Sequence, residues 1–233
     1  MKATTTVARW TWSGDFEDAA DAECGVGACL RELLTAYEVL RRHRFMVGIP
    51  RISVSVHEAG KKNSYLFRGD VQISAGAAPA ETARDAALRV YEAMRPGEIG
   101  SVYAHIDSPG DVLLGDAYRS EPPLLRVGSS ALLGYVSVDL ATRTDFWLPY
   151  DLKGRPQPEV YAANAPRLSA ALRDLSQALD SDTDPDDPTN FAKSHETGVE
   201  NYFDRDGNAR DVWDSFELST QYAERCDDQA PSY

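Results

Sequence analysis

The chain has 233 residues, of which 42% are hydrophobic and 26% are charged. This composition is typical of a folded globular protein, and the length is enough for one large domain or two small ones. Asp and Glu number 37 against 24 Lys and Arg, which gives a formal net charge of −13. Because like charges repel, nucleic acids and anionic membranes are disfavoured as partners, whereas a basic protein surface is favoured.

The N-terminal residues and the cysteines indicate a cytoplasmic protein. The first residues lack the apolar run of roughly 7–15 residues of a signal peptide, and no stretch approaches the ~20 apolar residues of a membrane span. Cys24, Cys29 and Cys226 form a sparse set of odd number, which fits a reducing compartment better than a disulfide framework. We therefore expect small buried thiols rather than disulfides.

The first half of the chain predicts two helices and several strands. Apolar residues at helical spacing predict a helix over 28–45, with its buried stripe formed by Leu30, Leu33, Leu34, Tyr37 and Leu40. Alternation of apolar and polar residues predicts strands at 52–57 and 65–73, joined by a hairpin loop at 60–63. A second helix is predicted from Pro79 to Arg95, followed by a strand at 101–106, a turn and a short apolar run.

The second half predicts strands at 132–140 and 144–148, joined around 141–143, and a third short strand at 159–162. Asn164 is predicted to cap a helix that reaches Leu179. The apolar stripe of this helix consists of Leu168, Ala171, Leu172, Leu175, Ala178 and Leu179.

These patterns together predict an α+β fold with mainly antiparallel sheet and helices packed on one side. Residues 1–180 are expected to form the core, with possible sub-units at 1–110 and 111–180. Five acids and two prolines in residues 180–188 should sustain neither helix nor strand, so 181–190 is predicted to be an acidic Asp/Pro linker. Residues 191–233 are predicted to contain a hairpin, in which Tyr202-Phe203 and Val212-Trp213 flank the turn at 204–208, and a tail.

The sequence carries no complete metal, cofactor or catalytic motif. Residues 204–208 begin like a calcium-binding loop, but Ala209 and Ser215 stand where such a loop has its glycine and its bidentate glutamate, which favours a simple turn. Cys24 and Cys29 have no second ligand pair for zinc. We therefore predict no catalytic, cofactor or metal residues.

Two histidines leave an enzymatic alternative open. His57 stands beside Glu58, and His105 lies two residues before Asp107, so either histidine has a carboxylate nearby for general-base work. No Gly-x-Ser-x-Gly elbow is present to supply an activated serine.

Residues 128–179 resemble the C-terminal half of the SUKH superfamily of immunity proteins. The resemblance is carried by three segments. Gly134–Asp139 is predicted to form a strand, Val160–Asn164 a strand that ends in small residues and an asparagine, and Leu168–Leu172 part of a helix. It implies an α+β fold and inhibition of a bacterial toxin, often a nuclease or deaminase. It implies no catalytic residue.

The first hypothesis is therefore a non-catalytic immunity protein that neutralises a basic toxin by covering its active face. The alternatives are a small enzyme that uses His57 or His105, and an acidic interaction or scaffold subunit. The predicted partner-binding residues are Asp15, Glu17, Asp18, Asp21, Glu23, Asp182, Asp184, Asp186 and Asp187. Large aromatics near these acids are candidate anchors, although base rates favour core positions for them: Trp10, Trp12, Tyr202 and Trp213.

Overall fold

The structure, a computed structural model, describes residues 2–3, 5–15, 24–73 and 78–213. Its main element is a seven-stranded antiparallel sheet with the strand order β3-β2-β4-β7-β8-β1-β9. The strands of this sheet are β1 (Ala8–Asp15), β2 (Arg51–Glu58), β3 (Tyr65–Gln72), β4 (Ile99–Asp107), β7 (Leu125–Leu132), β8 (Tyr135–Thr142) and β9 (Asp184–Pro185). Two small hairpins lie outside it, β5 (Gly110–Leu114) with β6 (Ala117–Glu121) and β10 (Lys193–His195) with β11 (Gly198–Glu200).

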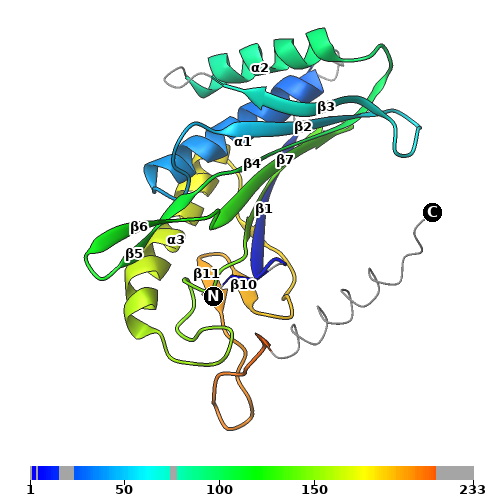
Figure 1. The fold of residues 1–233 in the computed structure, drawn as a ribbon. Helices are drawn as coiled ribbons and strands as arrows, with labels where there is room; N and C mark the ends of the chain where they lie inside the picture. Colours follow the sequence, from blue (N-terminus) through cyan, green and yellow to red (C-terminus); the bar gives the residue numbers. More distant parts are fainter. Residues whose placement is uncertain (1, 4, 16–23, 74–77, 214–233) are drawn as a thin grey trace, which may run out of the picture.

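Three helices lie on one side of the sheet: α1 (Cys24–Arg42), α2 (Pro79–Ala93) and α3 (Pro158–Leu179) (Figure 1). Helix α1 packs on β4, β7 and β8, and both other helices pack on α1. The opposite side of the sheet, which we call the open face, carries no helix in the described part of the chain. The predicted α+β class with helices on one side is confirmed.

Several local predictions in the first half are confirmed. The stripe of α1 is buried as expected, with Leu30, Leu33 and Leu40 fully inaccessible to solvent. β2 and β3 form the predicted hairpin, and α2 begins at Pro79. The first helix starts earlier than predicted, at Cys24, so Gly25 and Gly27 belong to its first turn.

The predicted hairpin in the 132–148 region is wrong in its position. Its turn lies at Leu133-Gly134, and β7 and β8 pair from Leu125↔Thr142 to Leu132↔Tyr135. Gly128 and Ser129 look like loop residues in the sequence, but both are buried in the middle of β7. The 144–148 segment forms a turn instead of a strand, because the hydroxyl of Thr144 and the carbonyl of Asp145 accept hydrogen bonds from backbone N–H groups two and three residues ahead.

The predicted strand at 159–162 and the cap at Asn164 are also wrong. Pro158 occupies the first turn of α3, so residues 159–164 are helical and Pro166 lies inside the helix. A proline cannot donate to the carbonyl four residues back. That residue is Ala162, which is exposed, so water can satisfy its carbonyl and the helix continues to Leu179. Asn164 is fully buried and serves a different purpose, described below.

Segments from the two ends of the described chain complete the sheet. β1, which the sequence analysis did not predict, lies between β8 and β9. The acidic segment that was expected to form no strand pairs with it, with Asp184 opposite Thr11 and Pro185 opposite Trp10. The predicted hairpin around 204–208 is present but short: the N–H of Arg210 donates to the carbonyl of Tyr202, whereas Val212 and Trp213 donate to the carbonyl of Leu152. Phe203 bridges to Ala209, which closes the turn at 204–208.

Candidate functional site

The open face of the sheet carries polar side chains because each strand alternates between the two faces. One row of cross-strand partners runs across all seven strands at mid-height. Its members are Asp70, Ser53, His105, Gly128, Asp139, Thr11 and Asp184. The missing side chain of Gly128 leaves room for its neighbours, since a Cβ there would lie 2.5 Å from Asp139 Oδ1 and 3.0 Å from Tyr103 Oη. The row therefore has a dense polar centre at β4, β7 and β8.

His105 lies in this centre and is held in its neutral form. Burial lowers the pKa of His105, and the nearby Arg126 guanidinium lowers it further, against the opposing effect of Asp107. His105 Nε2 lies 3.7 Å from Asp107 Oδ2, and Arg126 Nη2 lies 3.0 Å from the same oxygen. Nδ1 of His105 is buried and has no hydrogen-bond partner among the described residues. The imidazole is thus uncharged at neutral pH and already close to a carboxylate.

Neither predicted histidine is paired with a nucleophile in the described part of the chain. The hydroxyl of Ser53, the cross-strand partner of His105, donates to Asp70 Oδ1 at 2.7 Å. His57 lies four residues along β2 from Ser53 and packs its ring against Tyr65, with 4.5 Å between ring centroids. Nucleophilic catalysis requires a hydroxyl or thiol hydrogen-bonded to the base. The geometry therefore gives the enzymatic alternative no specific support.

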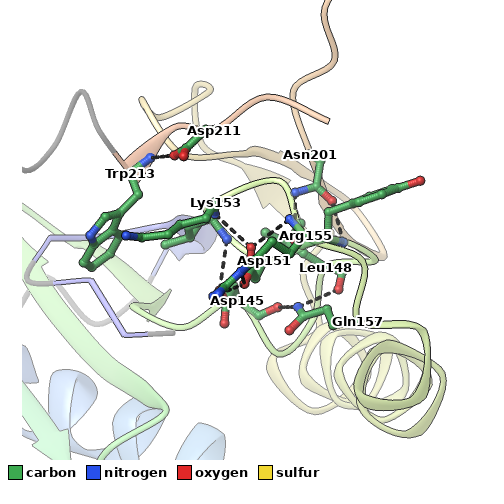
Figure 2. A network of polar contacts seen from close by, with 11 residues as sticks. Asp145, Leu148, Asp151, Lys153, Arg155, Gln157, Asn201, Asp211 and Trp213 are labelled. Atoms are coloured by element: carbon green, nitrogen blue, oxygen red, sulfur yellow. Dashed lines mark hydrogen bonds and ion pairs between the residues drawn. The ribbon is translucent and has the colours of Figure 1, made fainter. Parts of the chain in front are cut away.

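A buried polar network, which the sequence analysis missed, holds the long loop between β8 and α3 (Figure 2). Asp145 is fully buried, burial raises its pKa, and its Oδ2 accepts the N–H of Leu152 at 3.1 Å. The side-chain amide of Gln157 donates to the carbonyls of Asp145 and Leu148, and Asn201 exchanges two hydrogen bonds with the backbone of Tyr150. All of these contacts are between groups of the protein itself, so the network fixes the conformation of the loop.

Asp151 is the second carboxylate of this network. Burial acts to raise its pKa, but the bonds from the Arg155 guanidinium and from the backbone N–H groups of Arg155 and Lys153 outweigh burial and lower it. Both carboxylate oxygens are therefore occupied.

Five of the nine predicted acidic residues are described by the structure, and they lie at the β1–β9 edge of the sheet. Asp15 ends β1, and Ser181 Oγ donates to the carbonyl of Ser13, which brings the acidic segment alongside β1. We call the exposed carboxylates of this region the acidic edge: Asp15, Asp182, Asp184, Asp186 and Asp187. None of them has an ion pair with a described residue. The remaining predicted acids, Glu17, Asp18, Asp21 and Glu23, lie outside the described residues.

The candidate aromatic anchors belong to the core. Trp10 and Trp12 project from β1 toward the helices and are 0% and 2% exposed. Trp12 Nε1 donates to Ser176 Oγ in α3 at 2.9 Å, which explains how a buried indole is satisfied. Tyr202 and Trp213 are half-buried and pack against the same core. These four side chains stabilise the fold and are not free to anchor a partner.

The loop at 204–208 is closed by its own side chain. Asp204 Oδ1 accepts N–H groups of Asp206 and Asn208 at 2.9 Å, and these bonds, with that of Asn208 first, lower the pKa of Asp204. Among the described residues there is no group of three or more His, Cys, Asp or Glu side chains placed to hold a metal ion. Cys29 is buried, and burial raises the pKa of its thiol to about 12. The side chain of Cys24, and Cys226, lie outside what the structure describes.

Within the described part of the chain, no helix is long and apolar enough to cross a membrane. Comparisons with protein-family models, with curated proteins and with solved structures find no match for this chain.

Proposed function

We propose that the chain is a non-catalytic binding protein that neutralises a basic protein by covering its active face, as immunity proteins of bacterial toxin systems do. The observation that carries the proposal is the acidic edge. Two segments about 170 residues apart in sequence meet on one side of the sheet and place five exposed, unpaired carboxylates together. A nuclease- or deaminase-like toxin is the partner class that the sequence resemblance implies.

The carboxylates of the acidic edge are both unpaired and gathered at one edge of the sheet. Several other carboxylates are matched by cations, as in the pairs Arg44–Asp111, Arg126–Asp107 and Arg155–Asp151. An unpaired cluster produces a negative potential that extends into solvent, and such a potential accelerates encounter with a cationic surface. The proposed role of the acidic edge is to steer and orient the partner.

Part of the resemblance to the SUKH superfamily loses its basis, because Val160–Ala162 is helical and Asn164 does not cap the helix. What remains is a strand pair followed by an amphipathic helix. The proposal therefore depends chiefly on the electrostatics of the edge.

A salt series on a charge-neutralised variant tests the proposal. The variant carries Asp182→Asn, Asp184→Asn, Asp186→Asn and Asp187→Asn, and the partner is sought among the products of adjacent reading frames. Association with the partner should slow by about tenfold or more at low salt. The difference should largely disappear near 1 M salt, where the screening length is about 3 Å. Stopped-flow measurement of association and dissociation rates provides the readout.

A matched control removes the same charge elsewhere on the surface. Asp85, Glu92, Glu98 and Asp116 are exposed and lie on α2, after α2 and in the β5–β6 turn, away from the acidic edge. Replacing these four with their amides should leave the association rate nearly unchanged. Equal slowing by the two variants would show that only net charge matters, and an association rate insensitive to salt would refute the proposal.

A further inference from the structure

The turn between β7 and β8 exposes a group of large apolar side chains. Leu132, Leu133 and Tyr135 are 51%, 93% and 54% exposed. Single exposed apolar side chains are ordinary, but three within four residues at a projecting hairpin end form a continuous apolar tip. We call residues 132–135 the apolar tip.

The backbone conformation of the apolar tip is unfavourable for a leucine at position 133. Leu133 and Gly134 are the two central residues of the turn, with φ angles of 52° and 82°. A two-residue turn with positive φ at both positions favours Asn-Gly or Asp-Gly, because a branched apolar side chain is strained in the left-handed region. Leu133 thus neither buries its side chain nor suits its turn. A residue that is unfavourable for its backbone conformation and also exposed points to a role in binding.

The apolar tip lies next to the acidic edge. Tyr135 is the cross-strand partner of Asp15, and Ser181 bonds to Ser13 two residues earlier on β1. A recess of about 100 Å³ opens at the same end of the sheet, and its lining includes Asp15, Glu32, Val136 and Leu179. Arg31 also lines it and is paired with Glu32 at 3.0 Å. An apolar projection and unpaired carboxylates therefore share one surface.

We propose that the apolar tip is the anchor of the interface with the basic partner and inserts into an apolar depression on that partner, beside its cationic surface. This inference depends on the function proposed above. Interfaces commonly combine a small apolar centre, which sets the lifetime of the complex, with charges around it that set the rate of encounter. A second copy of this chain is a poor occupant, because it would bring two acidic edges close together and their charges repel.

Replacing Leu133 with Asn tests the anchor, because folding and binding should respond in opposite directions. Asn suits a left-handed turn position, so the variant should melt about 2 °C higher or more. Loss of an anchor should raise the dissociation rate by about 30-fold while the association rate changes little. Leu88→Asn is the matched control, since Leu88 is 54% exposed on α2, far along the sheet order. It should leave both rates unchanged.

The partner for these measurements is identified by photocrosslinking in the cells that express the chain. A photoreactive phenylalanine analogue at position 133 should crosslink to one basic protein, and the same analogue at position 88 should not. The purified crosslinked protein then serves in the rate measurements. Crosslinking at 133 to the chain itself, or to no protein, would overturn the inference.

The two proposals fail in different ways. Suppose that association with the partner depends on the acidic edge but the Leu133→Asn variant dissociates at the wild-type rate. That result refutes the anchor and leaves the proposed function intact. A partner that binds through Leu133 at a rate insensitive to salt and to the acidic edge refutes the electrostatic proposal instead.

Discussion

On the helix-covered face of the sheet, β4, β7 and β8 place Val102, Ala104, Val127, Val138 and Leu140 beneath α1, all nearly inaccessible to solvent. On the open face the same strands present half-buried polar side chains: Arg126, Ser130 and Asp139 form hydrogen bonds or ion pairs, and Tyr103 packs its ring against His105. Period-two alternation produces both faces from one stretch of sequence. The covered face therefore forms the apolar core, whereas the open face is polar and only partly buried, and the acidic edge beside it is exposed.

The largest expected effect separates the covered side from the acidic edge. Leu172 in α3 is fully buried, so Leu172→Ala should lower the free energy of unfolding by about 2–5 kcal/mol, through lost burial and the cavity left behind. Asp184→Asn should change it by less than about 0.5 kcal/mol, because Asp184 is exposed and unpaired. Urea denaturation measures both. Equal destabilisation would show that the acidic edge is part of the structural core.

A buried polar residue on the covered side gives an intermediate effect. Asn164 bonds to both the N–H and the carbonyl of Leu113, at 2.9 and 2.8 Å, and so fastens the β5–β6 hairpin to α3. Asn164→Ala leaves these backbone groups without partners and should cost about 1–3 kcal/mol. Ser169→Ala, on the same helix and half-exposed, is the control and should be nearly neutral. A neutral Asn164→Ala would mean that water replaces the amide at this position.

The smallest expected effect concerns pH and the open face. Because the pKa of His105 is below its ordinary value of 6.5 in the folded protein, the unfolded chain binds more protons as the pH falls below about 6.5. His105 therefore lowers stability in acid, and this effect fades as the pH rises above 6.5. His105→Gln should lose less unfolding free energy between pH 7.5 and 5.5 than the wild type. An NMR titration that places the imidazole pKa at or above 6.5 would contradict this.

The same comparison explains which parts of the fold could be predicted. α1 and the β2–β3 hairpin follow from local periodicity, because their apolar residues recur at regular spacing. The loop between β2 and β3 also contains a glycine, which favours a turn. β7 was missed because Gly128 and Ser129 are small residues typical of loops, and only the approach of Asp139 and Tyr103 shows why a glycine belongs in that strand. The predicted start of α3 was too late because asparagine is a common capping residue. The actual role of Asn164, its bonds to Leu113, depends on a hairpin 51 residues away in sequence.

The candidate site was predictable only in part. Charge alone identified the acidic residues, but their meeting at one edge depends on pairing between β1 and β9, which local patterns cannot reveal. The alternation of Trp10 and Trp12 with polar residues was a signal for β1 that could have been used. His105 stood out in the sequence as a titratable residue, yet its depressed pKa arises from burial and from Arg126 on a neighbouring strand. Leu133 gave no signal until the turn geometry placed it at positive φ.

The pairing of β1 has a consequence for how the chain folds during synthesis. β2 and β3 are close in sequence and can pair as soon as they leave the ribosome, but β1 must wait for β8, whose residue Thr142 pairs with Ala8. Contacts of such long range slow folding, because the intervening chain must be ordered first. Until residues 184–185 emerge, β1 is an uncovered edge able to pair with a strand of another chain. The short acidic strand therefore arrives late and covers two residues of this edge, and its charges disfavour pairing with a strand of another chain.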